Sequence, residues 1–382
     1  MLRNSRSFSR DHSHGLHTRR RRHVANTHFG KHVKPQRLAR KFKESSPKSS
    51  TLSDSIEKAF HTERPYPTSY EEVLLTSIIS NSNPSATTYE SAATFSRILL
   101  NLTAGTRALG YRYGMEIGKS LYRLLSSRKP YYWYEESIPD LISFLEKAIG
   151  VPASYSLLYS GLRVRIYNKQ GLYLGMNMHL FEAGIISGFV TAASKQITYM
   201  EEISCSNNGS DYCEFSLSPH RHNEENIEVS SALSRFAEHL SIMVKHPQTQ
   251  QNSVSRSYHA LLILSILRSS YSDAINNISG YFGFKVAQQL FDDKKPNAAR
   301  ISEYLLKTAI LLNFGAPTIK PSKDRTLLNM VLAFSPEVSK KEYVELSRAF
   351  INAMLSKAAH PRVSFEIDSR DSNYLLRIKE NP

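Results

Sequence analysis

The stretch Glu201–Pro219, EEISCSNNGSDYCEFSLSP, holds both cysteines of the 382-residue chain. Between Cys205 and Cys213 lies a run of turn-forming residues, SNNGSD. Such a run between two segments rich in apolar residues predicts a β-hairpin. We expect its arms at residues 197–203 and 212–217, with a turn that brings the two thiols together and with Glu202 close by.

The chain has only two cysteines, and they lie close together in the sequence, which bears on whether the protein works in a reducing or an oxidising compartment. In a large chain with 41% hydrophobic residues they favour a reducing compartment over a secreted disulfide scaffold. No apolar run reaches the roughly 18 residues of a membrane-spanning helix. The N-terminus also lacks the apolar core of a secretory signal. We therefore expect a soluble, cytoplasmic protein.

Positive charge is concentrated at the N-terminus. The formal net charge is +15, and residues 1–50 carry nine arginines and five lysines against two acidic residues. Few branched apolar side chains are present there to offset the entropy cost of folding. We expect residues 1–54 to form a disordered basic arm. It would serve as a phosphate-binding arm for nucleic acid, as a targeting segment, or only as a solvated tail.

The rest of the chain repeats itself. GMEIGKSLYRLL from Gly114 corresponds to GFKVAQQLFDDK from Gly283, and SDYCEFSL from Ser210 corresponds to SNYLLRIK from Ser372. A predicted helix ends at Gly150-Val151-Pro152 in one half and at Gly315-Ala316-Pro317 in the other. Matching order and spacing predict a tandem duplication.

We expect an α+β fold with two tandem domains, each with helices packed on a twisted antiparallel sheet. The expected boundaries are residues 55–219 for the first domain, 220–256 for a helix and linker, and 257–382 for a degenerate second copy. Apolar periodicity predicts five helices in the first domain: 70–79, 89–100, 104–125, 138–149 and 180–194. Alternation predicts three further strands: 155–159, 162–167 and 172–176.

One motif is misleading. GMEIGKS, residues 114–120, resembles a phosphate-binding P-loop, but three residues separate its glycines where that motif has four. It also lies inside a helical pattern. We expect no nucleotide site there.

The segment His179–Pro219 resembles the C-terminal half of the 4-vinyl reductase domain, a family of small-molecule-binding domains. The resemblance rests on two glycines in the predicted helix, an acid, two thiols and an aromatic residue: Gly184, Gly188, Glu202, Cys205, Cys213 and Phe215. Relatives that sense phenols bind zinc through these acid and thiol positions and a preceding cysteine. Here His179 stands at that first position, and histidine is also a zinc ligand.

The resemblance thus implies a metal site of His179, Glu202, Cys205 and Cys213 that holds structural zinc. Two thiolates, a carboxylate and an imidazole would complete a tetrahedral shell with no position left for water. The alternative is a pair of reduced, partly buried thiols with Glu202 solvated. His220 or His222 would be competing ligands. In the second copy Leu375 stands opposite Cys213 and Val344 opposite His179, so we expect no metal there.

Aromatic residues provide the second candidate site. In the resembling family the corresponding helices and strands surround an apolar cavity, and the candidate pocket residues here are Tyr111, Trp133, Tyr159 and Phe181. Tyrosine and tryptophan offer a bound ring both contact area and a hydrogen bond. The alternative is ordinary core packing.

These features favour a non-enzymatic sensor or regulator that binds a small hydrocarbon or aromatic molecule. No nucleophile elbow and no dinucleotide fingerprint is present, which leaves little support for a tetrapyrrole-related enzyme. A nucleic-acid-associated regulator that uses the basic arm is one alternative. A protein–protein scaffold like the vesicle-tethering subunits of similar fold is another. We expect either a homodimer or an internal pseudo-dimer of the two halves.

Overall fold

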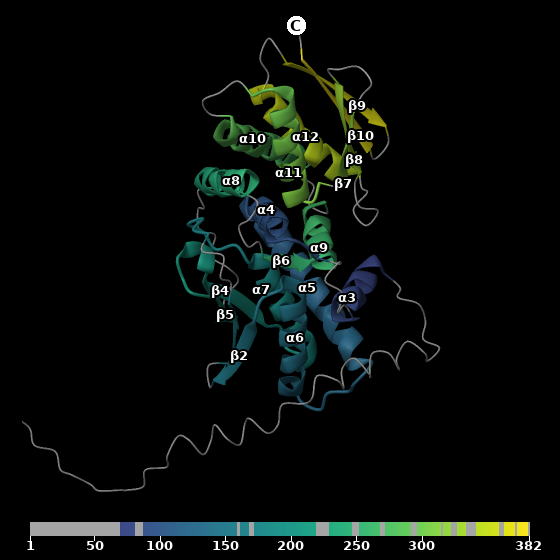
Figure 1. The fold of residues 1–382 in the computed structure, drawn as a ribbon. Coiled ribbons are helices and arrows are strands. Elements are labelled where there is room, and N and C mark those ends of the chain that lie inside the picture. The colour runs from purple at the N-terminus through teal and green to yellow at the C-terminus, as the bar shows by residue number, and fades with distance from the viewer. Residues whose placement is uncertain are drawn as a thin grey trace, which may run out of the picture. The chain divides into compact units, whose positions relative to one another are not determined.

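Two four-stranded antiparallel sheets with helices beside them form an α+β protein, as the sequence predicts (Figure 1). The computed structural model describes residues 69–80, 87–158, 161–167, 172–218, 229–246, 252–267, 272–291, 296–314, 316–321, 327–333, 341–358, 363–370 and 373–380. The predicted basic arm, residues 1–54, lies outside these ranges.

The helices and strands of the two halves follow one another along the chain. The first half and its flanking helices comprise α3 (Tyr70–Ser80), β1 (Thr87–Tyr89), α4 (Glu90–Leu100), α5 (Ala104–Ser126), η2 (Tyr134–Ser137), α6 (Ile138–Ile149), β2 (Ala153–Leu158), β3 (Gly161–Ile166), α7 (Leu180–Ser194), β4 (Tyr199–Ser204), η3 (Ser206–Asn208), β5 (Cys213–Ser218) and α8 (Val229–Lys245). The second half comprises β6 (Ser253–Ser255), α9 (Arg256–Leu267), α10 (Ser272–Leu290), α11 (Ala298–Leu311), β7 (Ala316–Pro321), β8 (Leu327–Ala333), α12 (Lys341–Ala358), β9 (Val363–Arg370) and β10 (Asn373–Glu380).

Both halves use the same order of elements. Each begins with a short strand and three α-helices, and continues with two strands, one helix and two strands. The sheet orders match as well, β2-β3-β5-β4 in the first half and β7-β8-β10-β9 in the second. The two short strands pair with each other in antiparallel fashion, with Thr88 opposite Val254. The repeated sequence patterns thus correspond to repeated topology.

Two local predictions differ from the structure. Residues 172–176 form no strand. Instead, the N–H groups of Leu174 and Gly175 both donate to the carbonyl of Asn207, at 2.8 and 2.9 Å. Alternate side chains of this segment, Leu172, Leu174 and Met176, are buried and so imitate a strand pattern. Gly175, with φ of 74°, instead adopts a left-handed loop conformation.

The second difference concerns the predicted linker at the end of residues 220–256. Its last part is structured, because Ser253–Ser255 form β6 and Arg256 begins α9. A polar three-residue strand has no periodicity of its own. It forms here because β1, which is distant in sequence, supplies the pairing partner.

The glycines of GMEIGKS have a packing role. A Cβ atom on Gly118 of α5 would lie 2.0 Å from the carbonyl oxygen of Ile185, and one on Gly188 of α7 would lie 2.0 Å from that of Met115. The backbones of α5 and α7 therefore touch, which only glycine permits. Gly283 makes the same kind of approach to Phe350 in the second half.

Among the described helices, none has the length and apolar composition needed to cross a membrane.

Candidate metal centre

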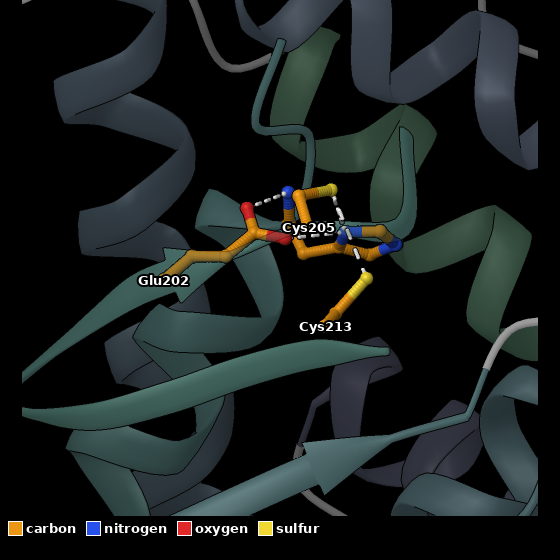
Figure 2. A group of neighbouring side chains, drawn as sticks. Glu202, Cys205 and Cys213 are labelled. Carbon is orange, nitrogen blue, oxygen red and sulfur yellow. Dashed lines mark hydrogen bonds and ion pairs between the residues drawn. The ribbon is translucent and has the colours of Figure 1, made fainter. Parts of the chain in front are cut away.

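The structure brings the four predicted metal ligands together. His179 immediately precedes α7, Glu202 lies on β4, Cys205 follows β4, and Cys213 begins β5. One donor atom from each residue lies within 4.8 Å of all the others, and all four side chains are buried. Figure 2 shows the carboxylate of Glu202 and the two sulfur atoms directed toward a common point.

The hairpin turn places the thiols. The carbonyl of Cys205 accepts hydrogen bonds from the N–H groups of Asn208 and Ser210, at 2.9 and 3.2 Å, and Gly209 takes the left-handed conformation that the turn needs. In a regular strand, residues three apart point to opposite faces. The pairing of β4 with β5 is irregular between Glu202 and Ser204, and this irregularity lets Cys205 point to the side that Glu202 occupies.

Two of the distances between donor atoms match those around a four-coordinate ion. Cys205 Sγ lies 3.5 Å from His179 Nδ1 and 3.7 Å from Cys213 Sγ. Tetrahedral zinc, with bonds of about 2.0–2.3 Å, would separate its ligand atoms by roughly 3.3–3.8 Å. Glu202 Oε1 lies closer, 2.9 Å from His179 Nδ1, and Glu202 Oε2 accepts the backbone N–H of His179 at 2.9 Å. The donor set and its spacing thus suit a metal ion.

The four ionisable groups of the candidate centre shift one another's pKa values. The hydrogen bond from the Cys205 thiol, and then the charge of His179, lower the pKa of Cys213 to about 3 despite its burial. Burial raises the pKa of Cys205. Burial acts to lower the pKa of His179, but the charges of Cys213 and Glu202 outweigh it and raise that pKa well above its usual value. A bound cation would replace the imidazolium charge and release protons.

Two supporting residues were not found from the sequence. Ser206 donates its backbone N–H to Cys213 Sγ at 3.3 Å, and its hydroxyl lies 3.2 Å from the same sulfur. Asn177 Nδ2 donates to the carbonyl of Glu202 at 2.9 Å. Outer groups of this kind fix the orientation of metal ligands. Serine and asparagine are common in turns and loops, so their types alone gave no signal. The competing candidates His220 and His222 lie outside the described residues.

Among the described candidates for the aromatic pocket, one is exposed and two are packed against other protein groups. Trp133 is 71% exposed, contrary to its predicted place in a pocket, because it lies in the surface turn that leads into η2. Tyr111 and Phe181 are buried, but Tyr111 Oη bonds both backbone groups of Met200, and Phe181 stacks on Tyr113. Tyr159 lies outside the described residues.

One small cavity lies elsewhere, beside the start of α4. Its volume is about 20 Å³, enough for a single water molecule. Its lining includes Glu90, Leu172 and His239 and none of the aromatic pocket candidates.

Comparison with known proteins gives no further assignment. No protein-family model, no curated protein and no solved structure matches the chain.

Proposed function

We propose that this is a non-enzymatic binding protein whose first domain contains a structural zinc ion held by His179, Glu202, Cys205 and Cys213. The observation that supports the proposal is the buried cluster itself, with its four donor atoms within 4.8 Å of one another. Buried ionisable side chains are costly unless they are paired or bind a metal. A single cation would satisfy all four.

The donor set favours zinc. Thiolate and imidazole ligands suit zinc, whereas calcium and magnesium prefer oxygen. Four protein ligands leave no open coordination position, so the ion would be structural and not catalytic. It would fasten the segment that enters α7 to the β4–β5 hairpin.

The ligand of the binding protein is proposed to be a small hydrophobic molecule. This part of the proposal rests on the resemblance of residues 179–219 to small-molecule-binding domains. A protein–protein scaffold is the second candidate, and one observation favours it. The hydroxyl of Tyr111 and the ring of Phe181, both candidate pocket groups, are already engaged by protein atoms.

Native mass spectrometry of the purified full chain tests both parts together. We expect one zinc per chain, and a hydrophobic ligand retained in protein from its own cells. Glu202→Gln removes the carboxylate charge at almost unchanged volume and should reduce zinc to a small fraction of an equivalent. Glu201→Gln is the matched control, because this neighbour is only half-buried and points to the other face of β4.

Zinc below a tenth of an equivalent in the unaltered protein would contradict the metal proposal. So would equal zinc in the two variants. A zinc-loaded protein without bound ligand, but with a protein captured in stoichiometric amount, would favour the scaffold.

A further inference from the structure

Helix α4 is buried along its whole length. All eleven of its residues are buried, and one of them is Arg97, which is 1% exposed. A helix covered on every side must contact several neighbours at once. A buried arginine is rare unless it is paired. The contacts of α4 therefore show which parts of the protein this helix joins.

On one side α4 holds the chain around the metal ligand His179. Arg97 Nε donates to Glu182 Oε1 at 2.7 Å, and Nδ2 of Asn101, the C-cap residue directly after α4, donates to the carbonyl of Met178 at 3.4 Å. Met178 precedes the ligand directly, and Glu182 follows it in the first turn of α7. The start of this helix is thus fixed on both sides of His179.

On the other side α4 contacts the second half. Phe95 stacks on Phe282 with ring centres 4.9 Å apart, and it also packs against Phe314 and Phe350. Ser91 Oγ donates to the carbonyl of Leu311 at 2.6 Å. These contacts couple the position of α4 to the core of the second half.

One residue of the second half reaches the same carboxylate as Arg97. Tyr258 of α9 is fully buried and donates its hydroxyl to Glu182 Oε1. Arg97 also pairs with Glu90 and lies 3.4 Å from Tyr258 Oη. Glu182 Oε2 has no hydrogen-bond partner among the described residues. Arg97 and Tyr258 thus supply the side-chain hydrogen bonds to this buried carboxylate, and the charge of His179 also favours its ionised form.

The repeat provides an internal comparison. The spacing that places Gly315 opposite Gly150 places Ser347 opposite Glu182 and Val344 opposite His179. Helix α4 begins directly after β1 and α9 directly after β6, so Glu90 corresponds to Arg256 and Arg97 to Ile263. At these equivalent positions the second half has neither the proposed metal ligands nor the residues of the buried ion pair. The two features occur together, as expected if they act together.

We propose that Arg97, Glu182 and Tyr258 are positioning residues for the metal centre, and that the second half sets metal affinity through the Tyr258 hydroxyl. The inference rests on the proposed metal function. By holding the first turn of α7, these residues keep the imidazole of His179 facing the thiols before the ion binds. Pre-organisation of this kind lowers the cost of binding.

Zinc affinity of the full-length protein, measured by competition with a chromophoric chelator, tests the inference. Tyr258→Phe deletes one hydroxyl and should weaken zinc binding about tenfold, the lower end of the effect of outer groups on metal sites. Tyr304→Phe is the control, since this buried tyrosine of the second half bonds Arg300 and not the metal segment. The d–d absorption of bound cobalt(II) should shift in Tyr258→Phe and stay unchanged in Tyr304→Phe.

The outcomes separate the two proposals. If the unaltered protein binds neither zinc nor cobalt, the metal function itself is wrong. If it binds zinc and both variants match it in affinity and in cobalt spectrum, the metal function stands and the role of Tyr258 is wrong. A lower melting temperature of Tyr258→Phe with unchanged zinc affinity would likewise overturn the inference, because it would show a purely structural hydroxyl.

Discussion

At the scale of single residues, His259 shows what burial does to an ionisable group. Its ring lies in α9, with Nε2 3.2 Å from Ser96 Oγ and Nδ1 3.1 Å from Asn313 Nδ2. Burial, with Arg97 as a further cause, lowers the pKa of His259 to about 3. The histidine is therefore neutral in the folded protein, although it would be protonated below about pH 6.5 in the unfolded chain.

We expect His259 to destabilise the protein in acid. The unfolded state takes up a proton near pH 6.5 and the folded state only near pH 3, so stability falls as the pH decreases between these values. The free energy of unfolding should fall by up to about 1.4 kcal/mol per pH unit from this group. Urea denaturation between pH 7 and pH 5 would measure the slope.

His259→Gln keeps a polar side chain but removes the titrating group, and it should flatten the slope by that amount. His246→Gln changes an exposed histidine and serves as the control. Equal slopes for the two variants would contradict this prediction. Contributions from metal release are common to both and cancel in the comparison.

At the scale of elements, the contact between α5 and α7 positions the helix that follows His179 of the candidate metal centre. Their glycines bring the two backbones together, and α7 begins directly after His179. The sequence predicted both helices and excluded a phosphate loop. It did not show that the glycines of one helix face the backbone of the other, because that contact joins residues far apart in the chain.

We expect Gly118→Ala to destabilise the fold. Its added methyl group would lie 2.0 Å from the carbonyl oxygen of Ile185, so the helices must separate. Overpacking of this kind costs about 1–3 kcal/mol. Thermal and urea unfolding would measure the loss.

Gly280→Ala is the matched control in α10, where the added atom would find its nearest neighbour, the carbonyl oxygen of Ala349, at 3.6 Å. There the better helix propensity of alanine should stabilise the protein by about 0.5–1 kcal/mol. Similar losses in both variants would show that the α5–α7 contact is not special.

At the scale of the whole molecule, the two halves share topology but not chemistry. Thr88 and Val254, the middle residues of the short strands that precede α4 and α9, face each other where β1 pairs with β6. Equivalent residues meet in this way across a two-fold dimer interface. The internal pseudo-dimer stays a prediction, and this pairing is consistent with it. Among the described residues, the candidate metal cluster lies in the first half, as does the buried ion pair of Arg97 with Glu90 and Glu182.

The basic arm gives the test of the nucleic-acid alternative. If residues 1–54 bind phosphate by counterion release, the full chain should bind single- and double-stranded DNA or RNA with an affinity that falls steeply with salt. A chain that begins at residue 55 should lose this binding. A fluorescence anisotropy titration at two salt concentrations would measure it, and equal binding by both chains would reject the alternative.

The sequence by itself determined the features that depend on neighbours along the chain. Helical periodicity and the turn between Cys205 and Cys213 arise from local patterns, and the repeat appears when one half of the sequence is compared with the other. The resemblance of residues 179–219 to a known domain added His179 and Glu202. The structure then brought these four residues together.

Only the tertiary structure decided the remainder. It left Trp133 exposed, made residues 172–176 a loop, and buried Arg97 between Glu90 and Glu182. The physical reason is the same in each case. Whether a side chain is exposed, ion-paired or hydrogen-bonded depends on residues distant in sequence. The periodicity of a single segment does not show which distant residues will contact it.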